Sequence, residues 1–209
     1  MDRIDFRKHL KALYGPTRKQ GFHLVDVPMM RFLMVDGHGD PNVAPAYGEA
    51  IETLYGVAYA LKFASKKQLE RDYVVPPLEG LWWSRDMQSF LRREKDKWDW
   101  TMMIMVPEWI GPAMIETTID AVRRKKAPPA LDRLRVEPLE EGRAVQVLHI
   151  GPYDAEGPVL EKMHTAFLPE NGLALTGKHH EIYLSDPRRV APDKLRTILR
   201  QPVREKPGR

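Results

Sequence analysis

Two segments of this chain follow the same pattern, in which a β-rich run stops at a glycine and a helical pattern comes next. Residues 32–37 precede an amphipathic stretch at 46–63, and residues 145–151 precede another at 159–167. The copies agree in pattern rather than identity, which indicates an internal duplication. Two strand-helix-strand-strand modules predict an α+β fold with pseudo-twofold symmetry around a central ligand cleft.

Other segments complete this expectation. A short helix is predicted at 3–14 and another at 115–124, from their helical apolar spacing. Strands are predicted from β-rich, alternating or turn-bounded runs at 22–35, 73–75, 81–83, 98–106, 143–150, 180–184 and near Val203. We therefore expect a single domain over residues 1–209, with an N-terminal helical extension at 1–21, a first repeat at 22–110 and a second repeat at 111–209.

Composition excludes several classes of protein. The chain has 209 residues, a net charge of +4 and no cysteine, so disulfide frameworks, thiolate metal sites and cysteine nucleophiles are ruled out. No run approaches the ~18 apolar residues of a membrane span. From residue 188 onward eight basic residues face two acidic ones, but no aromatic residue is interleaved with them, as single-strand binders require. We expect a cytoplasmic protein that binds neither membranes nor nucleic acid directly.

Four of the five tryptophans fall in one stretch, at positions 82, 83, 98 and 100. Indole rings bury a large apolar area and keep a polar N–H, so the cluster predicts either a core wall or a pocket for a flat ligand. Strand parity puts Trp82 and Trp83 on opposite faces and Trp98 and Trp100 on the same face. The neighbouring methionines 102, 103 and 105 favour a buried central strand, although such a wall can also adapt to ligands.

The run at 178–187 contains a carboxylate in mid-strand. The period of two places His179, Glu181 and Tyr183 on one face of that strand. A buried glutamate is costly without a partner, so Glu181 is either a solvent-facing or ion-paired position or a functional residue. Metal binding is not expected, because adjacent His179 and His180 point to opposite faces and the Glu-x-x-His motif ending at His164 has no second copy.

The segments 6–14, 28–42, 55–62, 79–83, 98–107 and 180–188 resemble the stand-alone GyrI-like small-molecule-binding domain proteins, and the similarity spans nearly the whole chain. That family is related to the effector-binding domains of multidrug-sensing transcription regulators and to the gyrase-inhibitor protein. The resemblance implies an aromatic-lined cleft between two repeats with a glutamate near its centre. Glu181 matches that glutamate.

Stand-alone members are similar to enzymes that open the ring of cyclopropanoid DNA-alkylating compounds with water, so the resemblance implies a detoxifying cyclopropyl hydrolase. Glu181 would be the catalytic general base, and Tyr55 or Tyr183 would donate a hydrogen bond to the substrate carbonyl. The other expected substrate-binding residues are Tyr59, Trp82, Trp83, Trp98, Trp100, Met105, Tyr153 and His179.

Two alternatives stay open at this point. One is a non-catalytic module that binds cationic or aromatic drugs, and the other is an interaction protein like the gyrase inhibitor. In each small-molecule case the partner is an aromatic or cationic compound, and no cofactor is expected. The oligomeric state, a homodimer included, is left open.

Overall fold

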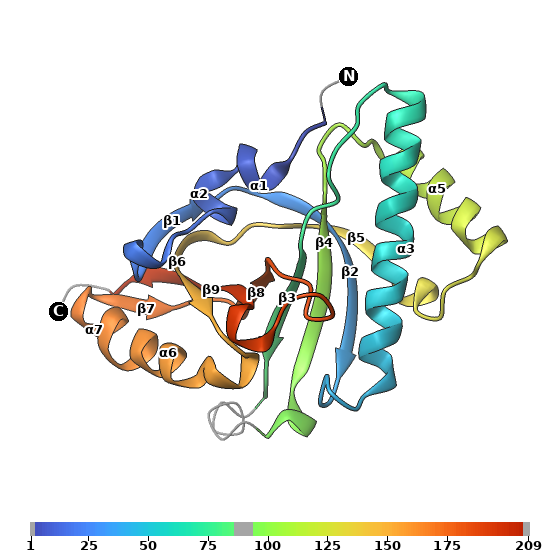
Figure 1. Ribbon diagram of the computed structural model, residues 1–209. Helices are drawn as coiled ribbons and strands as arrows, with labels where there is room; N and C mark the ends of the chain where they lie inside the picture. The colour runs from blue at the N-terminus through green and yellow to red at the C-terminus, as the bar shows by residue number, and fades with distance from the viewer. Residues whose placement is uncertain (1–2, 86–93, 207–209) are drawn as a thin grey trace. The chain divides into compact units, whose positions relative to one another are not determined.

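The computed structural model describes residues 3–85 and 94–206 and divides the chain into two compact units (Figure 1). Unit 1 consists of Met1–His9 and Met30–Leu139, and unit 2 consists of Leu10–Met29 and Glu140–Arg209. No helix among the described residues is long and apolar enough to cross a membrane.

Unit 1 contains an antiparallel four-stranded sheet. Its order is β3 (Leu78–Trp83), β4 (Asp99–Val106), β2 (Met30–His38) and β5 (Arg135–Leu139). Every residue of β4 after Asp99 is buried, and both Met102 and Met103 are fully inaccessible. The buried central strand predicted from the methionine run is confirmed.

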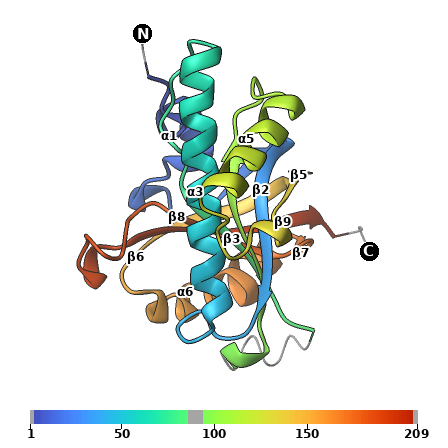
Figure 2. The same cartoon turned by 90° about the vertical axis from the view of Figure 1, so that its right-hand side faces the viewer.

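The long helix α3 (Pro45–Gln68) covers this sheet, as Figure 2 shows with β2 and β3 behind it. Its proline stands at the start of the helix, where the missing N–H costs nothing. Ala50, Leu54, Val57 and Leu61 form its buried stripe, spaced three and four residues apart as an amphipathic helix requires. Helix α5 (Pro112–Lys125) packs beside α3, and the short α1 (Phe6–His9) belongs to the same unit.

Unit 2 also contains a run of antiparallel strands. Its order is β1 (His23–Val27), β6 (Gly142–Ile150), β9 (Arg196–Glu205) and β8 (His179–Tyr183), and β7 (Leu173–Leu175) pairs with the far end of β9. The short helix α2 (Lys11–Tyr14) also belongs to this unit.

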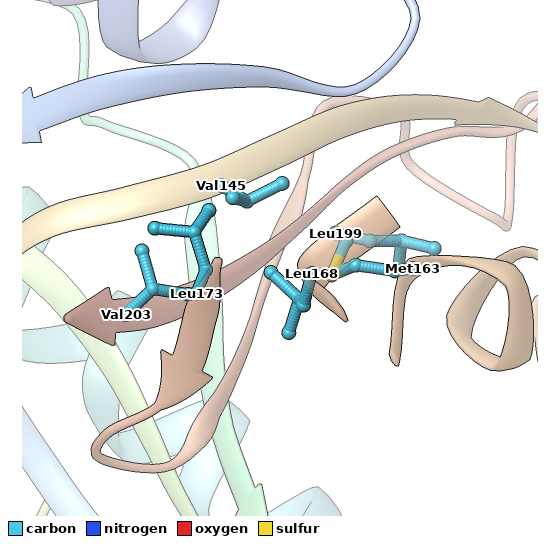
Figure 3. Close-up of a cluster of buried hydrophobic side chains, with 6 residues drawn as sticks. All are labelled: Val145, Met163, Leu168, Leu173, Leu199 and Val203. Atoms are coloured by element: carbon cyan, nitrogen blue, oxygen red, sulfur yellow. The ribbon is translucent and has the colours of Figure 1, made fainter. Parts of the chain in front are cut away.

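One face of the unit 2 strands is covered by a continuous helical segment. It runs through α6 (Gly157–Lys162), a π-helical turn (Met163–Phe167) and α7 (Leu168–Glu170). Figure 3 shows the apolar cluster beneath it, which consists of Val145, Met163, Leu168, Leu173, Leu199 and Val203. Burial of these side chains fixes the helix on the face that carries Leu199.

The predicted duplication is confirmed at the level of the modules. In unit 1, β2 is followed by α3, β3 and β4, and β4 pairs with both β2 and β3. In unit 2, β6 is followed by the helical segment, the short β7, β8 and β9, and β9 pairs with both β6 and β8. The repeat limits at 22–110 and 111–209, and the extension at 1–21, stay predictions.

The strands that precede the two modules are exchanged. β1 leads into β2 along the chain but pairs with β6, whereas β5 leads into β6 but pairs with β2. Each unit therefore contains a strand that is continuous, in sequence, with the first module strand of the other unit.

Several local expectations were wrong. The helix at 3–14 is interrupted at Leu10, and the strand at 22–35 is split by Pro28, which has no N–H to donate to a sheet. Tyr73 forms only an isolated bridge with Ile4. Strands β5 and β7 were not anticipated. Trp98 precedes β4, so strand parity does not govern its direction.

Candidate functional site

Glu181 lies on β8 with the two neighbours that the period of two predicts. Its side chain is 14% exposed, and that of His179 is 4% exposed. The Tyr183 hydroxyl donates a hydrogen bond of 2.9 Å to Glu181 Oε2. His179 Nε2 lies 3.3 Å from the other carboxylate oxygen, Oε1. One oxygen of this carboxylate therefore accepts a hydrogen bond from Tyr183, and the other lies beside the His179 ring without a hydrogen bond between them.

The register of β8 decides which face this is. Glu181 stands opposite Leu199 of β9, and Tyr183 stands opposite Thr197. Directly opposite residues of an antiparallel pair project to the same side of the sheet. Because Leu199 belongs to the cluster under α6 and α7, Glu181 lies on the helix-covered face rather than on an open one.

Two further side chains lie beside the neighbours of this carboxylate, Tyr183 and His179. The ring of Tyr153 packs edge-on against Tyr183, with centroids 5.7 Å apart. His164 comes from the π-helical turn, and burial, together with the charge of His179, lowers its pKa to about 4. A histidine with this pKa is neutral at pH 7. Its Nε2 is buried and has no hydrogen-bond partner among the described residues.

The opposite face of β8 carries a buried charge network. His180 Nδ1 is 2.9 Å from Glu141 Oε1, and Arg200 Nη1 donates to Glu141 Oε2 at 3.1 Å. Arg200 also donates to Gln146 Oε1 and to the carbonyl of Leu13. Burial raises the pKa of Glu141, but His180 and Arg200 outweigh that effect and lower it to about 2. This network anchors the strand that carries Glu181.

The predicted tryptophans gather in unit 1 around a residue that the sequence analysis missed. Tyr47, in the first turn of α3, contacts Trp82 at 6.2 Å and Trp100 at 5.4 Å between ring centroids. Trp82 also meets Trp98 edge-on at 5.8 Å. Trp100 is fully buried, and its indole N–H donates to the carbonyl of Gly39. Trp82 is 4% exposed, whereas Trp83 is half-buried, so the two differ as alternating strand residues do.

The remaining predicted residues of unit 1 lie on two elements. Tyr55 and Tyr59 are one turn apart on α3 with ring centroids 6.3 Å apart, and Tyr59 is 48% exposed. Met105 is buried in β4. The predicted site residues thus form groups within each unit. Glu181, His179, Tyr183 and Tyr153 lie together in unit 2, whereas in unit 1 Trp82, Trp98 and Trp100 form one group with Tyr47, and Tyr55 and Tyr59 form another.

Sequence reasoning missed Tyr47 and His164 for different reasons. Tyr47 lies at the start of a helix whose periodic stripe begins later, and its contacts depend on where β3 and β4 pair. His164 had a sequence signal only as part of the Glu-x-x-His motif, which does not indicate where its ring lies. Across residues 3–85 and 94–206, no group of three or more His, Cys, Asp or Glu side chains is arranged to hold a metal ion.

Two crystal structures from one organism are similar to this protein over nearly the whole chain. A crystal structure of an uncharacterized conserved protein from Listeria innocua is 41% identical, has a TM-score of 0.86 and aligns over 97% of this chain and 100% of its own. A crystal structure from the same organism, described as a hydrolase, is 39% identical with a TM-score of 0.83 and the same coverage.

A more distant structure has the same fold. The EcmrR C-terminal domain is 12% identical, with a TM-score of 0.55 over 88% of this chain and 97% of that domain. No curated protein matches the chain. The sequence model of the GyrI-like small molecule binding domain matches residues 21–204. This protein therefore belongs to the family of GyrI-like small-molecule-binding domains.

Proposed function

We propose that this protein hydrolyses cyclopropanoid DNA-alkylating compounds and that Glu181 is the general base. The observation that carries the proposal is the environment of its carboxylate, which is nearly buried, accepts a hydrogen bond from the Tyr183 hydroxyl, and is contacted by no lysine or arginine among the described residues. A carboxylate clamped by arginine would be a poor base, because the charged form would be too stable. The similarity to a protein described as a hydrolase supports the reaction class.

The reaction we propose adds one water molecule across a strained carbon–carbon bond. Glu181 takes a proton from water as its oxygen bonds to the methylene carbon of the cyclopropane. The ring bond to the neighbouring carbon breaks, and its electron pair moves through the conjugated system to the substrate carbonyl oxygen. That oxygen then takes up a proton from solvent and Glu181 releases its proton to solvent, so the net change is the addition of water and Glu181 returns to its starting state.

Negative charge on the carbonyl oxygen needs a hydrogen-bond donor. Tyr183 already donates to Glu181, so we assign this role to Tyr55, which is half-buried on α3. A positioned donor lowers the barrier because it is stronger against the developing oxyanion than against the ground-state carbonyl. The flat substrate would stack on aromatic rings, for which Tyr59, Trp82, Trp83 and Trp98 stay the candidates.

A specific observation favours a second candidate function, the binding of cationic aromatic drugs without turnover. Glu181 and the rings of Tyr153 and Tyr183 combine a carboxylate with aromatic surface. Such a set attracts organic cations by charge and by cation–π contact. In this second candidate function, Glu181 does not need to accept a proton.

A turnover assay separates the two functions. Purified protein is incubated with a cyclopropanoid alkylator, and the ring-opened, water-added product is followed by chromatography. We expect product from the parent and a loss of about 100-fold or more in Glu181→Gln, the scale on which general bases contribute. Glu170→Gln, an exposed glutamate of α7, is the matched control and should keep the parental rate. Equal rates in parent and Glu181→Gln would refute the mechanism, and binding without product would favour the second function.

A further inference from the structure

A second polar side chain lies on the helix-covered face of the unit 2 strands, next to Glu181. Thr197 of β9 stands directly opposite Tyr183 of β8, and Leu199, two residues further along β9, stands opposite Glu181. Thr197 and Glu181 are therefore diagonal neighbours on one face of the strands. Residues in this relation are about 7–8 Å apart, a spacing that one bridging water molecule can span.

The Thr197 hydroxyl is buried without a hydrogen bond. The residue is 0% exposed, and its Oγ1 has no partner in the part of the chain that the structure describes. The residue opposite Thr197 on β6 is His149, whose Nε2 donates to the carbonyl of Pro152 instead. A buried hydroxyl without a partner is costly, and such groups in folded proteins commonly bind an internal water molecule or a ligand.

The internal duplication shows that the module does not require polar residues at these two positions. Thr197 of unit 2 corresponds to Trp100 of unit 1, because each stands opposite the next-to-last residue of its first module strand. By the same register Glu181 corresponds to Gly80. Trp100 is fully buried. Unit 1 therefore forms the same module with an indole ring and a glycine, so the hydroxyl and the carboxylate of unit 2 have a role other than folding.

We infer that Thr197 is a positioning residue that holds the attacking water molecule against Glu181. This inference rests on the proposed function and adds a second contact to the water that Glu181 deprotonates. A buried water requires about two to four polar partners, and a hydroxyl can both donate to it and accept from it. Contacts with both side chains fix the water oxygen while its proton passes to Glu181. The Thr197 hydroxyl neither gains nor loses a proton in this step.

The water site can be tested without any substrate. A crystal structure of the protein, at a resolution that shows ordered water, should place one water within hydrogen-bond distance of both Thr197 Oγ1 and the Glu181 carboxylate. Crystals of Thr197→Val, which keeps the shape of the side chain and removes the hydroxyl, should lack this water, and crystals of Thr197→Ser should retain it. A parent structure without this water, or a Thr197→Val structure that keeps it, would overturn the inference.

Turnover tests what the contact contributes to the reaction. In Thr197→Val, kcat for the cyclopropanoid alkylator should fall by about 10-fold, the equivalent of one hydrogen bond. KM should stay unchanged, because the hydroxyl contacts the water rather than the alkylator. Thr197→Ser should recover most of the parental kcat. Thr118→Val, at a buried threonine of α5, is the matched control and should keep the parental kcat.

The remaining outcomes separate the inference from the proposed function. A parental kcat in Thr197→Val counts against the inference, and so do equal losses in Thr197→Val and Thr197→Ser, which would indicate a role in packing. If the crystals show the water as expected but the parent makes no product, the proposed function fails and the water site at Thr197 stands.

Discussion

At the scale of single residues, the chemistry of this protein depends on how one carboxylate is held. The Tyr183 hydroxyl and the His179 ring contact different oxygens of Glu181, and Leu199 and its apolar neighbours cover the same sheet face. A hydrogen bond to a charged group contributes about 1.5–3 kcal/mol, more than one between neutral groups. Small changes in this group should therefore be measurable in both activity and stability.

Tyr183→Phe tests this balance by removing the hydroxyl and keeping the ring against Tyr153. We expect kcat/KM for the cyclopropanoid alkylator to fall by about 10-fold or more, the equivalent of one hydrogen bond to a charged group. The free energy of unfolding in urea should fall by no more than about 1.5–3 kcal/mol, the contribution of one hydrogen bond to a charged group. A large loss of stability with unchanged kcat/KM would show that the tyrosine serves the fold rather than the site.

At the scale of elements, the end of β2 is fixed by a close approach between backbone and ring. Gly37 stands opposite Trp100 in the β2–β4 register, and a Cβ added at Gly37 would lie 2.0 Å from the nearest ring carbon. Packing therefore requires glycine at this position near the end of β2, whereas the sequence pattern indicated only a tight turn after the strand. The side chain of Trp100 can lie flat there because nothing else occupies the space.

Gly37→Ala and Gly56→Ala form a matched pair. The first should reduce the free energy of unfolding by about 1–3 kcal/mol, as overpacking of a filled core does. The second lies in α3 with nothing within 4 Å of the added Cβ, and it should raise the free energy of unfolding by about 0.5–1 kcal/mol. Urea titrations of both variants measure this difference. Equal effects of the two substitutions would contradict the packing argument.

The elements also show where sequence reasoning succeeds. The long helix at 45–68 and the buried β4 were predictable because their apolar periodicity is strong and local. Strand β5 was not, because Arg135, Glu137 and Pro138 give no β pattern, and it forms only because β2 offers it an edge. The alternation around Glu181 was predictable, whereas the approach of His164 depends on a helix that is distant in sequence.

At the scale of the whole chain, segments far apart in sequence meet in one buried charge network. Arg200 of β9 reaches the carbonyl of Leu13 and the carboxylate of Glu141, which in turn contacts His180 of β8. Removing one member of such a network leaves a buried charge without its partner, which costs about 3–5 kcal/mol. We therefore expect the stability of the protein to depend strongly on this network.

The network gives the protein a specific pH dependence. Glu141 has a pKa of about 2 in the folded chain against an ordinary value of 4.5, so its ionised form stabilises the fold. That contribution is complete above pH 4.5 and is lost as the pH falls towards 2, with a slope of at most about 1.4 kcal/mol per pH unit. The difference in unfolding free energy between parent and Glu141→Gln should therefore shrink as the pH is lowered from 6 to 3, on the order of 1 kcal/mol per unit at the acidic end. A difference that stays constant over this range would contradict the assignment.

The central claim, that Glu181 activates water, can be tested most directly by the origin of the oxygen in the product. A single turnover of the cyclopropanoid alkylator is run in water enriched in oxygen-18, with protein in excess. The mass of the product is then measured by mass spectrometry. A general base predicts that the first product already carries the heavy oxygen from solvent and that Glu181→Gln forms almost none. A first product with ordinary oxygen would show that the carboxylate itself attacks the ring, and labelled product formed equally fast by Glu181→Gln would show that another group activates the water.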